Sequence, residues 1–169
     1  MNHVVFTHGS GVDLNVRNRP NLTNSTVVGT RRYGSLVNVR STSLEHVSVG
    51  SANNWGELAL NQFANITRGD THTTGANGDL NLVRVTDIPG NRRMFTTANV
   101  RLRVGPLNNA FTPYITELNS GTAVTATHTV TIPELRGHSR NFSAFIRNWT
   151  RVAVGQNEGW IASEFLRNA

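Results

Sequence analysis

The side chains best suited to chemistry in this sequence are arginines and aromatic residues, and they recur at matched places. A strand-like segment ends at Arg17 in the first half of the chain and at Arg103 in the second. A guanidinium pairs through a planar fork with carboxylate or phosphate, and an aromatic face stacks on a sugar ring or a peptide plane. The candidate binding residues are Arg17, Tyr33, Trp55, Arg103, Tyr114, Trp149 and Trp160.

Each of these residues also has a purely structural interpretation. The two arginines could brace their own loops, and the tyrosines could lie at the edge of a core. The tryptophans could fill the interior, because a buried indole removes a large apolar area from water. We expect Trp160→Ala to unfold the second half of the chain rather than only weaken binding. The sequence leaves both interpretations open.

The residue pattern argues against an enzyme. The chain has no cysteine, so it holds no disulfide, zinc-thiolate site or cysteine nucleophile. Its six histidines are scattered, and no H-E-x-x-H run, nucleophile elbow, P-loop or dinucleotide fingerprint occurs. Residues 68–79 are rich in Gly and polar residues but lack the ligand spacing of a calcium loop. We therefore expect no catalytic residue, no cofactor and no metal.

The charge balance favours an anionic partner. The formal net charge is +6, and all sixteen basic residues are arginine. At ordinary usage roughly ten lysines would be expected in a chain of this length. The excess of arginine fits a surface that binds anionic polymers or proteins, or it reflects a lineage habit. The arginines form no polybasic block and accompany no known nucleic-acid motif, so we expect no specific nucleic-acid binding.

The elements that would position the candidate residues form a pattern that occurs twice. At residues 14–34 and again at 100–121, an alternating strand ends in Arg, then come a proline turn, a polar loop, a second apolar strand and a Gly. The proline and the glycine are 14 residues apart in the first copy and 15 in the second. Alternation with period two predicts half-buried strands. We therefore predict an all-β chain, with residues 57–66 as the one stretch that could be helical.

These segments resemble the bacterial SH3-like domain. L-N-V-R-N-R-P followed by V-V-G-T-R-R-Y-G is similar to the family run L-N-V-R-S-G-P and V-I-G-T-L-x-x-G-T, and V-R-L-R-V-G-P followed by Y-I-T-E-L-N-S-G-T fits the same frame. Near the end, N-W-T-R-V resembles the W-x-K-V strand, and G-W-I-A-S-E-F-L resembles the closing G-W-V-x-S-x-Y-L. The resemblance covers nearly all of residues 97–167 and about residues 12–60.

The resemblance implies two small SH3-like, partly open β-barrels in tandem. It places the first, divergent unit at residues 1–67, a linker or bridging strand at 68–93, and the second unit at 94–169 with an insertion at 133–147. The first copy departs from the family at Arg19, where the family has Gly, and it lacks the closing G-W-V segment.

Two functions remain open. The resemblance implies a non-enzymatic binding protein whose partner is peptidoglycan, a similar wall-type polymer or another protein. The alternative is a structural subunit of a virion or an extracellular filament, in which copies of the chain bind one another.

No apolar run is long enough to span a membrane, and the first residues lack the features of a secretory signal. The compartment stays undetermined, with the cell surface, the extracellular space or a virion favoured.

Overall fold

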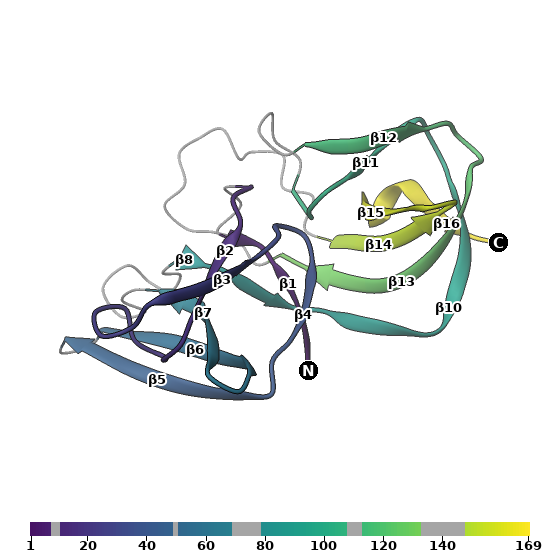
Figure 1. The fold of residues 1–169 in the computed structure, drawn as a ribbon. Coiled ribbons are helices and arrows are strands. Elements are labelled where there is room, and N and C mark those ends of the chain that lie inside the picture. The colour runs from purple at the N-terminus through teal and green to yellow at the C-terminus, as the bar shows by residue number, and fades with distance from the viewer. Residues whose placement is uncertain (8–10, 49–50, 69–78, 108–112, 133–147) are drawn as a thin grey trace. The chain divides into compact units, whose positions relative to one another are not determined.

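The computed structural model describes residues 1–7, 11–48, 51–68, 79–107, 113–132 and 148–169 (Figure 1). Most of the glycine-rich loop at 68–79 and the whole insertion at 133–147 lie outside the described residues. The described chain consists of strands and loops and includes the 3-10 turn η3 (Ser163–Phe165), and it contains no α-helix. The predicted all-β class is confirmed.

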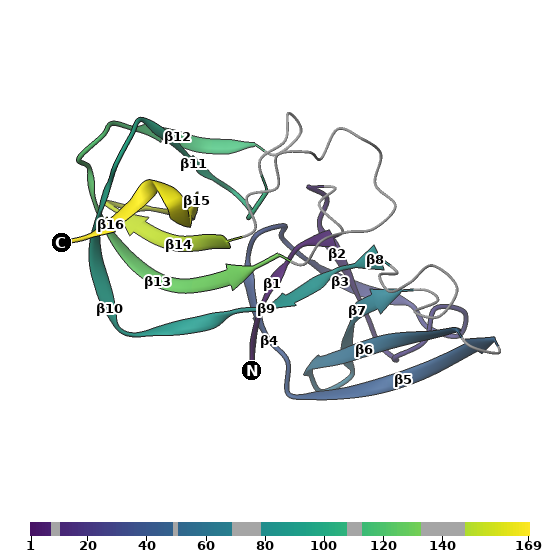
Figure 2. The same ribbon diagram turned by 180° about the vertical axis from the view of Figure 1, so that it is seen from behind.

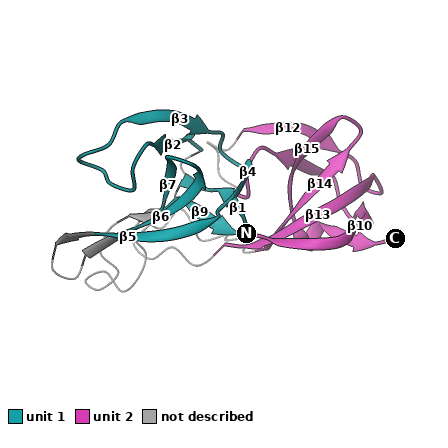
Figure 3. Cartoon of the chain, turned by 60° about the horizontal axis from the view of Figure 1, so that its bottom comes forward, with its two compact units in different colours: residues 1–84, 135–142 teal, residues 85–134, 143–169 magenta. Residues whose placement is uncertain are grey.

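The described chain divides into two compact units, residues 1–84 and residues 85–132 with 148–169 (Figure 3). The stretch expected to be a linker or bridging strand, residues 68–93, is shared between them. Its residues 82–84 pair with a strand of unit 1, and its residues from 86 onward pair with a strand of unit 2. The division of the chain falls between Arg84 and Val85.

Unit 1 contains two sheets. One has the strand order β4-β1-β9 and the other β3-β2-β7-β6-β5, with β8 paired to β7 (Figure 2). The strands are β1 (Asn2–Val5), β2 (Leu14–Arg17), β3 (Val27–Arg31), β4 (Leu36–Asn38), β5 (Ser41–Ser48), β6 (Ser51–Ala59), β7 (Gln62–Arg68), β8 (Asp79–Leu80) and β9 (Leu82–Arg84).

Unit 2 contains one sheet of seven strands in the order β12-β11-β15-β14-β13-β10-β16 (Figure 1). The strands are β10 (Thr86–Thr96), β11 (Val100–Arg103), β12 (Tyr114–Leu118), β13 (Ala123–Thr131), β14 (Asn148–Val154), β15 (Asn157–Ala162) and β16 (Leu166–Asn168). None of the sheets in the described chain closes into a barrel, because each has two end strands.

The two units have the same strand order. The path β3-β2-β7-β6-β5 in unit 1 corresponds to β12-β11-β15-β14-β13 in unit 2, and β4-β1-β9 corresponds to β13-β10-β16. One long strand, β13, thus occupies the positions of both β4 and β5. In unit 1 the chain separates these two strands at Val39 and Arg40, and in unit 2 the register of β13 shifts between Ala126 and His128.

The correspondence extends to individual residue pairs. In unit 1 the β2–β3 register shifts between Val16 and Arg17, and in unit 2 the β11–β12 register shifts at the matching place, between Leu102 and Arg103. The strands β9 and β16 also pair with β1 and β10 in the same register. Val4 pairs with Val83 in unit 1, and at the matching place in unit 2 Phe95 pairs with Arg167. The sequence repeat is therefore also a repeat of backbone hydrogen bonding.

Matched turns hold each repeat together. Gly34 and Gly121 both have positive φ, +77° and +82°, a conformation that glycine adopts without steric cost. The Gly34 N–H donates to the Val5 carbonyl oxygen at 2.8 Å, and the Gly121 N–H donates to the Thr96 carbonyl oxygen at 2.7 Å. The glycine that ends each sequence repeat thus ties its turn to the first strand of its unit.

The cores follow from the alternating pattern of the strands. In both β2 and β11 the first and third residues are buried and the second is exposed. Unit 1 gathers a buried cluster of Val5, Leu14, Val37, Val39, Ala64, Ile66 and Leu82. Unit 2 gathers Val100, Leu102, Leu118, Val124, Ala126, Val152 and Ile161.

The expectation that residues 57–66 could be helical was wrong. This stretch forms the hairpin between β6 and β7, with Asn61 at φ +56° in its turn. Leu60 is 78% exposed at that turn. Asn tolerates a left-handed conformation better than most residues, so Asn61 marks a turn that the apolar pattern concealed.

Candidate functional site

The first candidate arginine, Arg17, braces its own loop. Its Nη1 lies 3.1 Å from both the carbonyl oxygen and the Oγ of Ser25, and 3.5 Å from the Leu22 carbonyl oxygen. These bonds tie the end of β2 to the polar loop that leads to β3. The arrangement matches the structural interpretation of Arg17 that the sequence left open.

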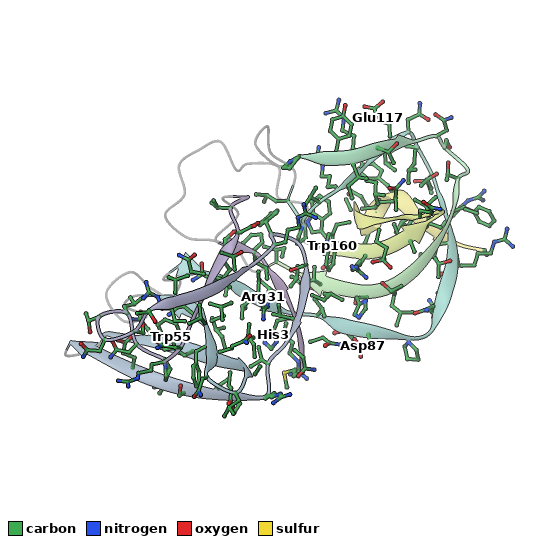
Figure 4. The ribbon with its side chains drawn as sticks, viewed as in Figure 1. His3, Arg31, Trp55, Asp87, Glu117 and Trp160 are labelled. Carbon is green, nitrogen blue, oxygen red and sulfur yellow. The ribbon has the colours of Figure 1, made fainter. Side chains whose placement is uncertain are left out.

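Trp55, labelled in Figure 4, belongs to a partly buried polar network in unit 1. Its ring is 1% exposed, and its Nε1–H donates to Glu45 Oε2 at 2.9 Å. Asn53 Nδ2 donates to the same oxygen at 2.9 Å, and the Leu22 backbone N–H donates to Glu45 Oε1 at 3.0 Å. One carboxylate thereby joins the β5–β6 hairpin to the loop that Arg17 holds.

The electrostatics of Glu45 reflect these bonds. Burial by itself would raise the pKa of the Glu45 carboxyl. The hydrogen bonds from Asn53, Leu22 and Trp55, together with the positive charge of Arg17, outweigh it and lower that pKa below its ordinary value. Glu45 was not among the expected site residues, because nothing in the sequence around it indicates which residues it binds.

Two further candidates are buried. Tyr33 is 2% exposed, and its backbone N–H donates to Asp13 Oδ1 at 3.0 Å. Trp160, labelled in Figure 4, is 1% exposed, and its register partner in the β11–β15 pair is Arg103. Both side chains are placed to fill the interior of their units. The expected unfolding of the Trp160→Ala variant stays a prediction.

Unit 2 contains a pocket that brings two candidates together. It measures about 250 Å³ and is formed by β11, β14, β15 and the η3 turn. Arg103 and Trp149 both contribute to its wall, and Trp149 does so although it is only 2% exposed. The remaining lining residues, which the sequence did not single out, are Asn99, Val100, Arg101, Ile161, Ala162 and Phe165.

Arg101 connects this pocket to the edge strand β12. Its guanidinium carbon lies 4.7 Å from the centroid of the Tyr114 ring, and its Nε donates to Glu117 Oε1 at 3.0 Å. Tyr114 is 48% exposed, so this stacked pair is open to solvent. Arg101 stands two residues before Arg103, and the period of a strand places both on one face. That spacing was the signal in the sequence that would have found Arg101.

The chemistry of the pocket suits a small group with both apolar and anionic parts. Its volume is slightly below the range of about 300–1,000 Å³ that drug-sized ligands occupy. Aromatic and aliphatic side chains form one part of the wall, and two arginines and an asparagine form the other. Asn99 is fixed in place, since its Oδ1 accepts the Ser120 backbone N–H at 2.9 Å.

The corresponding region of unit 1 is lined differently. The residues that match Ala162 and Phe165 by backbone register are Asn65 and Asn81. Asn81 Nδ2 donates to Asn65 Oδ1 at 3.1 Å, so these two side chains bind each other. At these two positions, amide side chains thus replace the apolar side chains of the unit 2 pocket.

The described residues contain no group of three or more His, Asp or Glu side chains placed to hold a metal ion. In the same part of the chain, no helix has the length and apolarity needed to cross a membrane.

Comparison with known proteins does not assign a family. No protein-family model, no curated protein and no solved structure matches this chain.

Proposed function

We propose that this chain is a non-enzymatic binding protein built from two open SH3-like modules, in which the pocket of unit 2 holds a short segment of its partner. The partner is a wall-type polymer such as peptidoglycan, or another protein. The single observation that carries the proposal is the pocket that places Arg103 and Arg101 beside Trp149 and Phe165.

The sequence repeat and the shared strand order support the modular part of this proposal. Both units build the same path of strands, although their pocket regions differ. A scaffold that keeps its hydrogen bonding while its surface side chains change is typical of binding modules, whose function lies in sites carried by a common fold. On this view unit 2 carries the binding site, and unit 1 is a scaffold or binds elsewhere.

Co-sedimentation with purified, insoluble peptidoglycan tests the proposal. Arg101→Gln removes a charge at the mouth of the pocket, and Ala162→Leu fills the pocket from its apolar side. We expect both variants to remain in the supernatant while the wild type sediments. Arg32→Gln, an exposed change in unit 1, is the charge-matched control and should sediment. Sedimentation of all four proteins would exclude this pocket as the binding site.

One observation favours the alternative of a structural subunit. The edge strands β3 and β12 occupy the same place in the two units, and each exposes two consecutive apolar residues. Within the described chain each pairs on one side only. Open strand edges of this kind pair readily with other chains. The exposed residues are Val27 at 48%, Val28 at 52%, Tyr114 at 48% and Ile115 at 40%.

Light scattering separates the two functions. A particle of large, defined mass that dissociates in a Val28→Lys, Ile115→Lys variant would favour the structural subunit. A monomer of 18.5 kDa in both proteins would favour the binding module.

A further inference from the structure

A second cationic site lies at the other end of the unit 2 sheet from β12, on β10 and β16. The guanidinium carbon of Arg93 is 5.5 Å from the centroid of the Phe95 ring, and that of Arg167 is 5.9 Å from the same centroid. Arg93 and Phe95 are two residues apart on β10, and Arg167 is the cross-strand partner of Phe95 on β16. All three side chains therefore lie on one face of the sheet.

The two guanidinium groups of this cluster have no carboxylate partner in the described part of the chain. The ion pairs found there are Arg101–Glu117, His128–Asp87 and Arg151–Glu158. Arg93 and Arg167 are both exposed. Two like charges held at one ring repel each other, and an anion bound between them would relieve that repulsion.

The neighbourhood adds positive charge. Arg92 is exposed on the opposite face of β10, where its Nη1 lies 3.5 Å from Asn168 Oδ1. The Ala169 backbone N–H donates to the Arg93 carbonyl oxygen at 3.3 Å, which fixes the end of β16 beside β10. Three arginines thus gather on two paired strands.

The fold does not require these arginines. In unit 1 the strand pair β1–β9 has the same register as β10–β16, and the matching residues are Asn2, Val4 and Val83. None of them is charged, and yet the same strands form. The arginines of unit 2 are therefore additions to a scaffold that forms without them.

We propose that Arg93 and Arg167 form a binding site for a phosphate-type oxyanion, separate from the pocket that Arg101 and Arg103 line. A guanidinium binds phosphate through paired N–H donors, and these bonds are stronger than those between neutral groups. The Phe95 ring holds both guanidinium groups by cation–π contact, so less side-chain freedom is lost when the anion binds.

Titration with tripolyphosphate, followed by calorimetry and by amide NMR, tests this site. The Arg93→Gln, Arg167→Gln double variant should bind tripolyphosphate at least about tenfold more weakly than the wild type does. In the wild type, the largest shifts should fall on the amides of β10 and β16. Without tripolyphosphate, the amide spectrum of the variant should match that of the wild type, which shows that the variant is folded.

The matched control is the Arg19→Gln, Arg40→Gln double variant, which removes the same charge from exposed positions in unit 1. It should bind as the wild type does. Equal weakening in both double variants would show that only net charge matters and would overturn the proposal. Absence of binding to the wild type would overturn it as well.

Discussion

Trp55 donates its indole N–H to the carboxylate of Glu45, with 2.9 Å between Nε1 and Oε2. This contact joins the largest buried side chain of unit 1 to an acidic residue on the neighbouring strand. The same oxygen accepts Asn53 Nδ2 at 2.9 Å. A single carboxylate therefore accepts from two donors of β6, and removing it would take this acceptor from both.

Glu45→Ala should destabilise unit 1. A buried donor that loses its acceptor costs about 1–3 kcal/mol, and this change affects the indole of Trp55 and the amide of Asn53. The free energy of unfolding is best followed through the NMR signal of the Trp55 indole N–H during urea titration. Glu57→Ala on the adjacent strand is the control, because the bond that Glu57 accepts from Ser41 at 2.8 Å is exposed. Equal loss in both variants would contradict the network.

The stability of unit 1 should depend on pH through Glu45. The pKa of this carboxyl is lowered in the folded chain, so its contribution is complete above its ordinary pKa and is lost as pH falls through the folded value. The urea midpoint of the wild type should therefore decrease from about pH 4.3 downward. Glu45→Gln should be less stable at neutral pH and should show a flatter profile. Parallel profiles for the two proteins would argue against this role.

Gly159→Ala should destabilise unit 2. A Cβ at this position would lie 2.6 Å from the Arg103 carbonyl oxygen and 2.8 Å from Leu102 Cγ, so β15 could not approach β11 as closely. Overpacking of this kind costs about 1–3 kcal/mol. Gly29→Ala is the control, since a Cβ there meets nothing within 4 Å. Thermal unfolding of the two variants checks the prediction, and equal melting temperatures would contradict it.

Asp87→Asn should lower the pKa of His128. Burial already lowers that pKa, Asp87 and Glu158 raise it, and Arg151 lowers it further. His128 Nε2 lies 3.3 Å from Asp87 Oδ1, so removing this charge leaves burial less opposed. NMR titration of the His128 ring measures the shift directly. Glu164→Gln, an exposed change in the same unit, should leave the titration unchanged.

The sign of the associated stability change follows. Because the folded chain lowers the pKa of His128, its contribution to unit 2 is complete above the ordinary histidine pKa and decreases as pH falls through the folded value. Asp87→Asn should extend this loss to lower pH. A titration of His128 that is the same in both proteins would show that the Asp87 contact does not form in solution.

Much of the local structure could be predicted from the sequence. Alternation with period two identified the strands that begin at Leu14 and Val100, and Gly34 and Gly121 marked turns that do have positive φ. The reason is that strand alternation and turn residues are local properties of the chain. The match between the two repeats was visible for the same reason, because equivalent side chains recur at equivalent places.

Only the tertiary structure decided which residues meet. Glu45 reaches Trp55 and the Leu22 backbone because a hairpin and a loop come together, and nothing in the spacing of these residues requires it. Trp149 lines a pocket while Trp160 on the next strand is enclosed, although both are tryptophans in strands. Which face of a strand is covered depends on the neighbours that the whole fold supplies. The sequence by itself determined a duplicated set of β-strands, and the long-range pairing of those strands determined where a ligand could bind.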